Sequence, residues 1–200
     1  MSAEAVVHFA PAEGREPAGS LSEKARKAYL ATGFNDRLAE GDFTALKIHF
    51  GEAGNTGHIK PAWLGGLVRE VRGKTSRAFL TDSNTLYVGR RSNSIDHLRL
   101  AWSHGFTPEA TGLPIIIADG LIGRDKREPR SAQARTSSSK IASAILDADA
   151  MIVLSHVTGH VQTGIGAAIK NVGMGCASRA GKLEQHSVAH PRVDAKRCLD

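Results

Sequence analysis

Short apolar runs separated by turn-forming residues divide the chain into alternating strands and helices. Five runs have the length of strands, and they cover residues 5–9, 44–50, 77–81, 114–118 and 150–154. Longer stretches with helical signals lie between most of them. Strands that alternate with helices predict an α/β fold with a mostly parallel sheet, helices on both faces and a glycine-rich loop after the last central strand.

Four helices are predicted between these strands. Ser20 and Glu23 have the spacing of a capping box, which predicts a helix from Ser20 to about Thr32 that Gly33 ends. The helix after Pro61 carries apolar residues at helical spacing, and its apolar face is expected to pack on the core. The last two are predicted from Asn93 or Ser94 to His104, before Gly105, and from Lys140 to Asp147.

The length and composition predict one α/β domain over residues 1–197. Two hundred residues with 41% hydrophobic content suffice for a single well-buried core. Residues 124–139 are charged, rich in serine and without periodicity, so they are predicted to form a mobile loop within this domain.

The charge and the ends of the chain exclude several classes of protein. The net charge is +6, but the basic residues are spread along the chain and form no recognised nucleic-acid module, so no nucleic-acid partner is expected. The N-terminus lacks the basic segment and the long apolar stretch of a secretory signal. No apolar run reaches the length of a membrane span. The sequence therefore predicts a cytoplasmic protein with no membrane partner.

The densest group of reactive side chains lies in residues 150–187, where the apolar run is followed by histidines and six glycines. Glycine permits the close backbone approach that a loop around an anion or a flat cofactor needs. Two phosphate-binding motifs do not fit this stretch. Gly175 and Gly181 enclose five residues where a P-loop has four, and Ile169 occupies the third glycine position of the dinucleotide fingerprint.

His160, Lys170 and His186 remain as candidates for chemistry in this glycine-rich stretch. One interpretation is a histidine acid/base catalyst or metal ligand beside a nucleophilic or anion-binding lysine. The alternative is that both histidines are surface loop residues and that Lys170 is a solvated helix lysine.

Polar side chains also follow four of the predicted strands. In a parallel sheet the ligand site lies beyond the carboxyl ends of the strands, so these residues are expected to meet at one edge. We therefore predict that they bind a small anionic ligand or cofactor. The predicted ligand-binding residues are His49, Glu52, Asp82, Asn84, Asp119 and His156.

For the arginine pair Arg90 and Arg91 and for His97, the sequence allows two interpretations each. Arg90 and Arg91 have the fork geometry that suits a carboxylate or a phosphate, but adjacent arginines are more often solvated surface residues. His97 lies within the third predicted helix, at a spacing compatible with either the edge of the core or the site.

Three blocks of the sequence match a known family in order: KIHFGEAGNTGHIKP, FLTDSNTLYVGRRSNSIDHL and LSHVTGH…GAAIKNVGMGCASRAGKLEQHS. From about Ser20 to Cys198, the chain resembles the iron–sulfur centre proteins of domain-of-unknown-function family 362. More distantly, the histidine and lysine spacing is similar to that of the nickel-pincer lactate racemases. This second resemblance implies that His160 is an acid/base catalyst, that Lys170 holds a nickel-pincer-like cofactor and that His186 ligates nickel.

The first resemblance also concerns the cysteines. Members of that family commonly continue into a ferredoxin-like segment, which implies a 4Fe–4S cluster in a longer form, with residues 198–200 at the start of the segment and Cys198 as a metal ligand. A four-iron cluster takes about four thiolates. The chain has two cysteines, Cys176 and Cys198, so one copy of these residues cannot build the cluster.

Two functions from different classes are consistent with these patterns. The first is a redox- or isomerase-type protein in which His160 exchanges a proton and Lys170 holds an anionic or carbonyl-bearing group. The second is a non-catalytic electron-transfer or assembly module that binds a protein partner, for example a redox partner, through the same loops.

Overall fold

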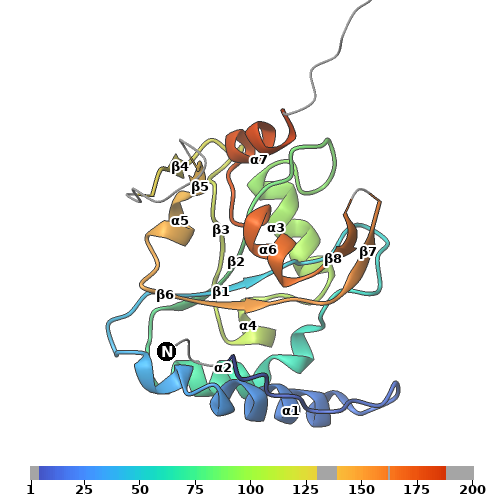
Figure 1. Cartoon of the computed structure of the whole chain (residues 1–200), viewed down its shortest axis with the longest axis vertical. Helices are drawn as coiled ribbons and strands as arrows, with labels where there is room; N and C mark the ends of the chain where they lie inside the picture. Colours follow the sequence, from blue (N-terminus) through green and yellow to red (C-terminus); the bar gives the residue numbers. More distant parts are fainter. Residues whose placement is uncertain (1–4, 130–138, 162, 188–200) are drawn as a thin grey trace, which may run out of the picture.

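Four parallel strands form the central sheet of the protein (Figure 1). The computed structural model describes residues 5–129, 139–161 and 163–187. The sheet order is β3-β2-β1-β6, and the predicted α/β fold is confirmed. Its strands are β1 (Thr44–Ile48), β2 (Ala78–Asp82), β3 (Ile115–Ile117) and β6 (Ala150–Leu154).

Helices and two small antiparallel hairpins complete the described part of the chain. The hairpins are β4 (Lys126–Arg127) with β5 (Ile141–Ala142), and β7 (Thr158–His160) with β8 (Gly164–Gly166). The α-helices are α1 (Ala18–Ala31), α2 (Gly65–Arg72), α3 (Ser94–Ser103), α4 (Pro108–Thr111), α5 (Ser143–Leu146), α6 (Ala168–Gly173) and α7 (Arg179–His186), with short 3-10 helices η1 (Phe34–Arg37) and η2 (Pro61–Trp63).

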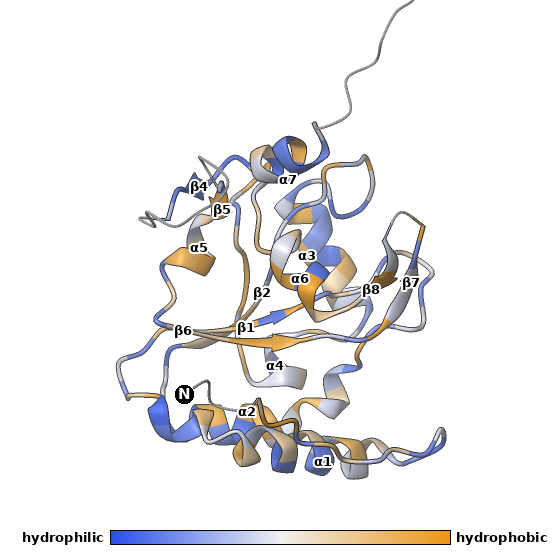
Figure 2. Ribbon diagram, viewed as in Figure 1, coloured by the Kyte–Doolittle hydropathy of each residue, from blue (hydrophilic) through white to orange (hydrophobic). Residues whose placement is uncertain are grey.

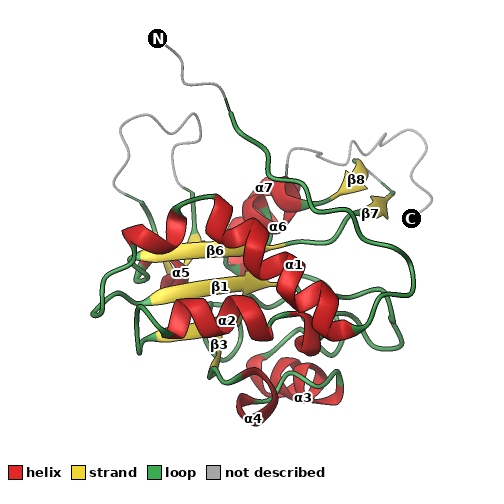
Figure 3. Cartoon of the chain, turned by 90° about the horizontal axis from the view of Figure 1, so that it is seen from below, coloured by secondary structure: helices red, strands yellow, loops and turns green. Residues whose placement is uncertain are grey.

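Helices cover both faces of the sheet, as predicted. Helices α1 and α2 lie on one face, while α6 and α7 lie on the other (Figures 1 and 3). The main core lies under α2, whose residues Leu67, Val68 and Val71 pack with Leu46 and Leu80 of the strands. Figure 2 shows β6 as a largely apolar strand, whereas α1 mixes polar and apolar residues because one of its sides faces solvent.

The register of the strands places their carboxyl ends together. Lys47 pairs with Thr81, Ile48 with Leu154, and Asp82 with Ile117. Because all three pairings are parallel, the loops that leave the strands emerge at the same edge of the sheet.

Several element boundaries agree with the sequence and others are shifted. Asn93 caps α3 by accepting a hydrogen bond from the Asp96 N–H, and Gly33, with φ of 68°, follows the end of α1. The predicted capping box at Ser20 is wrong, because α1 begins at Ala18. Pro61 starts a 3-10 turn, and α2 begins only at Gly65, so that Gly65 and Gly66 form its first two positions.

The predicted first strand does not form. Residues 5–9 have no regular secondary structure, and Val6, Val7 and Phe9 are exposed. An apolar run becomes a strand only where a neighbouring strand accepts its backbone hydrogen bonds, and no strand of the described sheet pairs with this segment.

The structure around the predicted mobile loop also differs from the prediction. Lys126–Arg127 forms β4 inside that segment, and Ile141–Ala142 forms β5 where the sequence predicted the start of a helix. Only Ser143–Leu146 is helical there. Residues 130–138 lie outside the described residues. In the described part of the chain, the helices are all too short or too polar to cross a bilayer.

Candidate functional site

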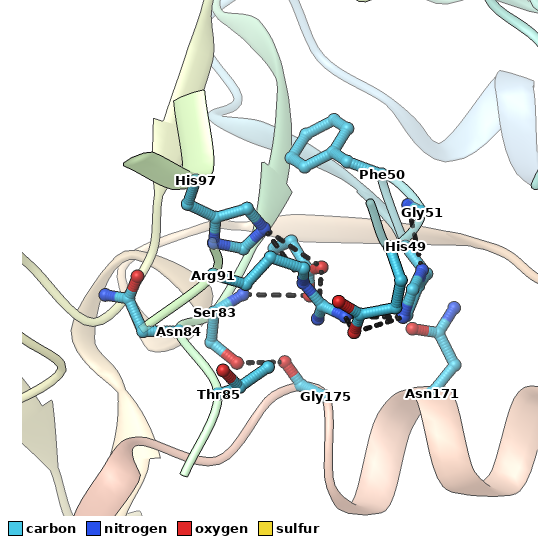
Figure 4. Close-up of polar contacts among 12 residues, drawn as sticks. His49, Phe50, Gly51, Ser83, Asn84, Thr85, Arg91, His97, Asn171 and Gly175 are labelled. Carbon is cyan, nitrogen blue, oxygen red and sulfur yellow. Dashed lines mark hydrogen bonds and ion pairs between the residues drawn. The ribbon is translucent and has the colours of Figure 1, made fainter. Parts of the chain in front are cut away.

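Polar residues from all four strand ends lie at the carboxyl edge of the sheet, and Figure 4 shows a group of them in contact. The elements bring them there because each residue directly follows, or ends, a parallel strand. Their ligand-binding roles stay predictions. The residues are His49 after β1, Asp82, Ser83 and Asn84 at the end of β2, Asp119 after β3 and His156 after β6.

The carboxylate of Asp82 lies at the centre of this edge. Its Oδ1 is 2.9 Å from Lys47 Nζ and accepts a hydrogen bond of the same length from the Ser83 N–H, while its Oδ2 is 3.1 Å from Arg91 NH2 and 3.6 Å from His97 Nε2. Burial alone would raise the pKa of Asp82, but Lys47 and Arg91 outweigh it and hold this pKa well below its usual value. Asp82 is therefore a permanent buried anion that organises cations.

Arg91 joins this centre to the rim of the site. Its NH1 contacts the Glu52 carboxylate, which also accepts a hydrogen bond from the Tyr87 hydroxyl. Of the two interpretations left open for the arginines, the solvated surface residue is correct for the exposed Arg90 and wrong for Arg91, which is buried. Burial alone would lower the pKa of Arg91, but the charges of Asp82 and Glu52 outweigh burial and raise this pKa above its usual value. The guanidinium therefore stays charged.

His49 lies between two hydrogen-bond donors. Arg91 NH1 is 2.6 Å from its Nε2, and the Gly51 N–H is 2.9 Å from its Nδ1. An N–H donor therefore faces each ring nitrogen, and a neutral imidazole, which carries one N–H, can accept from only one of them. Addition of a second proton would leave neither nitrogen able to accept, so the charged form of His49 is disfavoured. Burial, followed by the Arg91 charge, lowers the pKa of His49 to about 4. His156 is close by, with ring centroids 6.2 Å apart.

A second polar group lies beside β2 and β3. Lys182 of α7 donates to Ser83 Oγ at 2.6 Å and to the Ala177 carbonyl at 2.5 Å. Ser83 Oγ in turn donates to the Gly175 carbonyl at 2.6 Å. Burial lowers the pKa of Lys182 to about 8, even though Asp119 opposes the shift.

Asn84 and Asp119 form the remaining part of this group. The backbone N–H and the side-chain amide of Asn84 both donate to Asp119 Oδ1 at 2.9 Å. Within the described chain, Asp119 Oδ2 and Asn84 Oδ1 are buried and have no hydrogen-bond partner. Burial raises the pKa of Asp119 to about 6, although the Asn84 N–H lowers it. Asp119 is thus an anion that the protein stabilises poorly.

His160 and Lys170 both lie next to Gly166 of the β7–β8 hairpin. A Cβ on Gly166 would lie 3.7 Å from Lys170 Cδ and 3.9 Å from His160 Cβ. Burial, followed by the charge of Arg91, lowers the pKa of Lys170. Among the described residues it makes no hydrogen bond or ion pair, which leaves its ammonium available.

A family model for a domain of unknown function, DUF362, matches residues 44–199. The chain belongs to the DUF362 family. No match was found in comparisons with curated proteins or with solved structures. The match begins at the first residue of β1, so the DUF362 domain contains all four strands of the sheet and the whole candidate site.

The described part of the DUF362 domain does not fit a metal centre. Residues 5–129, 139–161 and 163–187 contain no group of three or more His, Cys, Asp or Glu side chains that could hold a metal ion. Cys176 is buried, and burial raises the pKa of its thiol, which disfavours the thiolate that iron requires. His186 is exposed at the end of α7, and Figure 1 places that helix apart from the hairpin of His160. Cys198 lies outside the described residues.

Sequence reasoning missed four residues of this site, Lys47, Ser83, Asn171 and Lys182, and it left the role of Arg91 open. One signal was available, because Lys47 interrupts the apolar run TALKI of a strand buried on both faces. A charge at such a position requires a partner. The others come from loops and from α6 and α7, whose placement over the sheet depends on tertiary packing.

Proposed function

We propose that this protein binds a small anionic ligand at the carboxyl edge of its sheet and exchanges a proton with it, as a redox- or isomerase-type protein. Lys170 holds the anionic or carbonyl-bearing group, and His160 carries the proton. The observation that supports this is that both side chains lie next to Gly166, although their positions are ten residues apart in the sequence.

The charge distribution supports the choice of an anion. Lys47 and Arg91 are matched by Asp82 and Glu52, whereas Lys170 has no counter-ion among the described residues. The repulsion between Arg91 and Lys170 is one of the causes of the lowered pKa of Lys170, after burial. An anion bound beside Lys170 would relieve this repulsion.

The hairpin supports a proton-carrying role for His160. Thr163 Oγ1 lies 2.9 Å from His160 Nδ1 and donates to the Ile165 carbonyl at 3.1 Å. A hydroxyl that donates elsewhere can accept from Nδ1–H, and this tautomer leaves Nε2 as the basic nitrogen. The backbone N–H of Thr163, 3.2 Å from Nδ1, favours the other tautomer, in which Nε2 bears the proton. In both tautomers Nε2 is the nitrogen that exchanges a proton with the ligand.

Neither cofactor implied by resemblance contributes a step to this proposal. One copy of the two cysteines has fewer than the about four thiolates of a 4Fe–4S cluster, and the proposal assigns no role to His186. The iron–sulfur association of the family and the nickel-pincer-like cofactor therefore stay expectations from resemblance. Iron and acid-labile sulfide assays on purified protein test the first of them.

Titration with 2-hydroxy and 2-oxo acids, lactate and pyruvate, tests the ligand site. We expect amide shifts at Gly166 and Lys170 in NMR spectra, and about tenfold weaker binding in Lys170→Ala, the scale of one lost charge-assisted hydrogen bond. Lys27→Ala, on α1, is the control and should bind normally. Equal affinity in Lys170→Ala and the parent protein would refute the site.

Deuterium exchange tests the proton transfer separately. Pyruvate incubated with the protein in D2O should incorporate deuterium next to its carbonyl, and His160→Gln should bind pyruvate but lose the exchange. Exchange at the parent rate in His160→Gln would remove His160 from the proposal.

The non-catalytic alternative is supported by a different observation. Val157, Val161, Ile165 and Ile169 are exposed on and beside the β7–β8 hairpin, and clustered exposed apolar residues mark interaction surfaces. Under this alternative, Ile165→Ser abolishes partner binding in a pull-down with redox proteins, and Lys170→Ala changes nothing.

A further inference from the structure

Helix α6 carries Lys170, yet it buries none of its own side chains. Ile169 is 92% exposed, and Val172 is 39% exposed. The helix has six residues, which is too short to be stable on its own. Hydrophobic burial therefore does not hold α6, and Lys170 with it, at the edge of the sheet. Polar contacts must do so.

The side-chain amide of Asn171 supplies these contacts. Its Oδ1 accepts a hydrogen bond from Lys47 Nζ at 2.6 Å. Its Nδ2 donates to the Leu154 carbonyl at 3.0 Å and to Ser155 Oγ at 2.8 Å. The amide thus uses both of its N–H groups and its oxygen. It ties α6 to the end of β6 and to β1, which is 124 residues away in the sequence.

Lys47 is a rigid anchor for this amide. Its side chain is 1% exposed, and Nζ is fixed on the other side by the Asp82 carboxylate at 2.9 Å. The approach of α6 to Lys47 also requires a glycine, because a Cβ on Gly175 would lie 2.8 Å from Lys47 Nζ and 2.2 Å from the Asn171 carbonyl oxygen. Asp82, Lys47 and Asn171 therefore connect the centre of the site to the helix that bears Lys170.

We propose that Asn171 is a positioning residue, which holds Lys170 in place at the candidate site through Lys47 and the end of β6. The importance of Lys170 for a ligand rests on the proposed function, but the positioning itself does not. Other described contacts of α6 are weaker anchors. Gln185 donates to the Gly173 carbonyl at 3.1 Å from an exposed position, where water competes for the same groups.

The test measures Lys170 directly and needs no ligand. The pKa of its amine is obtained from the NMR titration of the protein methylated with 13C-formaldehyde, and the stability of α6 from amide hydrogen exchange. In Asn171→Ala we expect the Lys170 pKa to rise toward the ordinary lysine value, because the side chain becomes more exposed and moves away from Arg91. We also expect the α6 amides to exchange about tenfold faster.

Two further variants make the result decisive. Ile169→Ala, on the same helix, removes a side chain that packs on almost nothing, and it should change neither measurement. Ser155→Ala removes one acceptor of the Asn171 amide and should shift both measurements in the same direction by a smaller amount. It replaces Asn171→Ala if that variant does not fold.

The proposal is overturned if folded Asn171→Ala, or Ser155→Ala in its place, keeps the parent Lys170 pKa and exchange rates. It is also overturned if Ile169→Ala gives the same changes. Failure of the proposed function is a separate result. It would appear as unaltered pyruvate binding in Lys170→Ala, while the titration and exchange measurements could still show that Asn171 holds the helix.

Discussion

Lys47 Nζ and Asp82 Oδ1 are 2.9 Å apart, and each side chain is only 1% exposed. The two residues lie on the neighbouring strands β1 and β2. Because Asp82 also pairs with Arg91 at 3.1 Å, one buried carboxylate contacts two cations. Removal of this anion leaves both cations buried without full compensation, which costs more than the ion pair itself contributes.

Asp82→Asn should therefore strongly destabilise the protein. We expect a loss of about 3–5 kcal/mol in the free energy of unfolding, measured by urea denaturation at neutral pH. Asp36→Asn is the matched control, because it breaks an ion pair with Lys74 at 3.5 Å in which the Asp36 side chain is 84% exposed. The control should lose less than about 1 kcal/mol. Similar losses in the two variants would contradict the central role of Asp82.

Gly175→Ala should destabilise the end of α6, whereas Gly173→Ala should not. A Cβ on Gly175 would lie 2.2 Å from the Asn171 carbonyl oxygen, while a Cβ on Gly173 meets nothing within 4 Å. Overpacking of this kind costs about 1–3 kcal/mol. Urea denaturation of the two variants measures the difference, and equal stabilities would show that the backbone has room at Gly175.

The fold could be predicted because the strands carry their signal locally. The runs at β1 and β2 are largely apolar because these central strands are buried along their whole length, and the parallel order of the four strands follows from the helices between them. The run at residues 5–9 has the same local signal but no pairing partner in the described sheet, so the same reasoning failed there. Whether a strand pairs is decided by tertiary structure, which a single run does not encode.

The site could be predicted only in part, for a related reason. Strand ends are visible in the sequence, and this located Asp82, Asn84 and Asp119 at one edge. The partners of these residues come from loops and from short helices with weak propensity. Arg91, for example, looks like a surface arginine in a polar loop, and only the packing of that loop against Asp82 buries it.

The stacked imidazoles of His58 and His104 should make the protein less stable in mild acid. Their ring centroids are 4.3 Å apart with 16° between the planes. Burial lowers the pKa of His58, and the charges of Lys60, His104 and His156 lower it further, although the Asn55 carbonyl opposes this.

The sign of this effect follows from proton linkage. A histidine with a lowered folded pKa binds protons less readily than in the unfolded chain, so its stabilising contribution is present above the unfolded value and is lost as the pH falls below about 6.5. In thermal denaturation between about pH 5 and 7.5, His58→Phe should show a smaller fall in Tm than the parent protein. His8→Phe, at an exposed N-terminal position, should leave the profile unchanged. A parent-like profile in His58→Phe would assign the acid sensitivity to other groups.

Asp119 should have the opposite pH dependence. Burial raises the pKa of its carboxyl group from 3.8 to about 6, so the folded protein binds this proton more readily than the unfolded chain does. The contribution of Asp119 to stability is therefore present at low pH and is lost as the pH rises through about 6. Asp119→Asn cannot ionise, so the stability of this variant relative to the parent should increase by about 1–3 kcal/mol between about pH 4 and 7. Urea denaturation at both pH values measures this change, with the exposed Asp36→Asn as control. A difference in unfolding free energy between variant and parent that stays constant with pH would mean that Asp119 ionises at its ordinary pKa. In that case water or a ligand satisfies Asp119 Oδ2, which has no hydrogen-bond partner among the described residues.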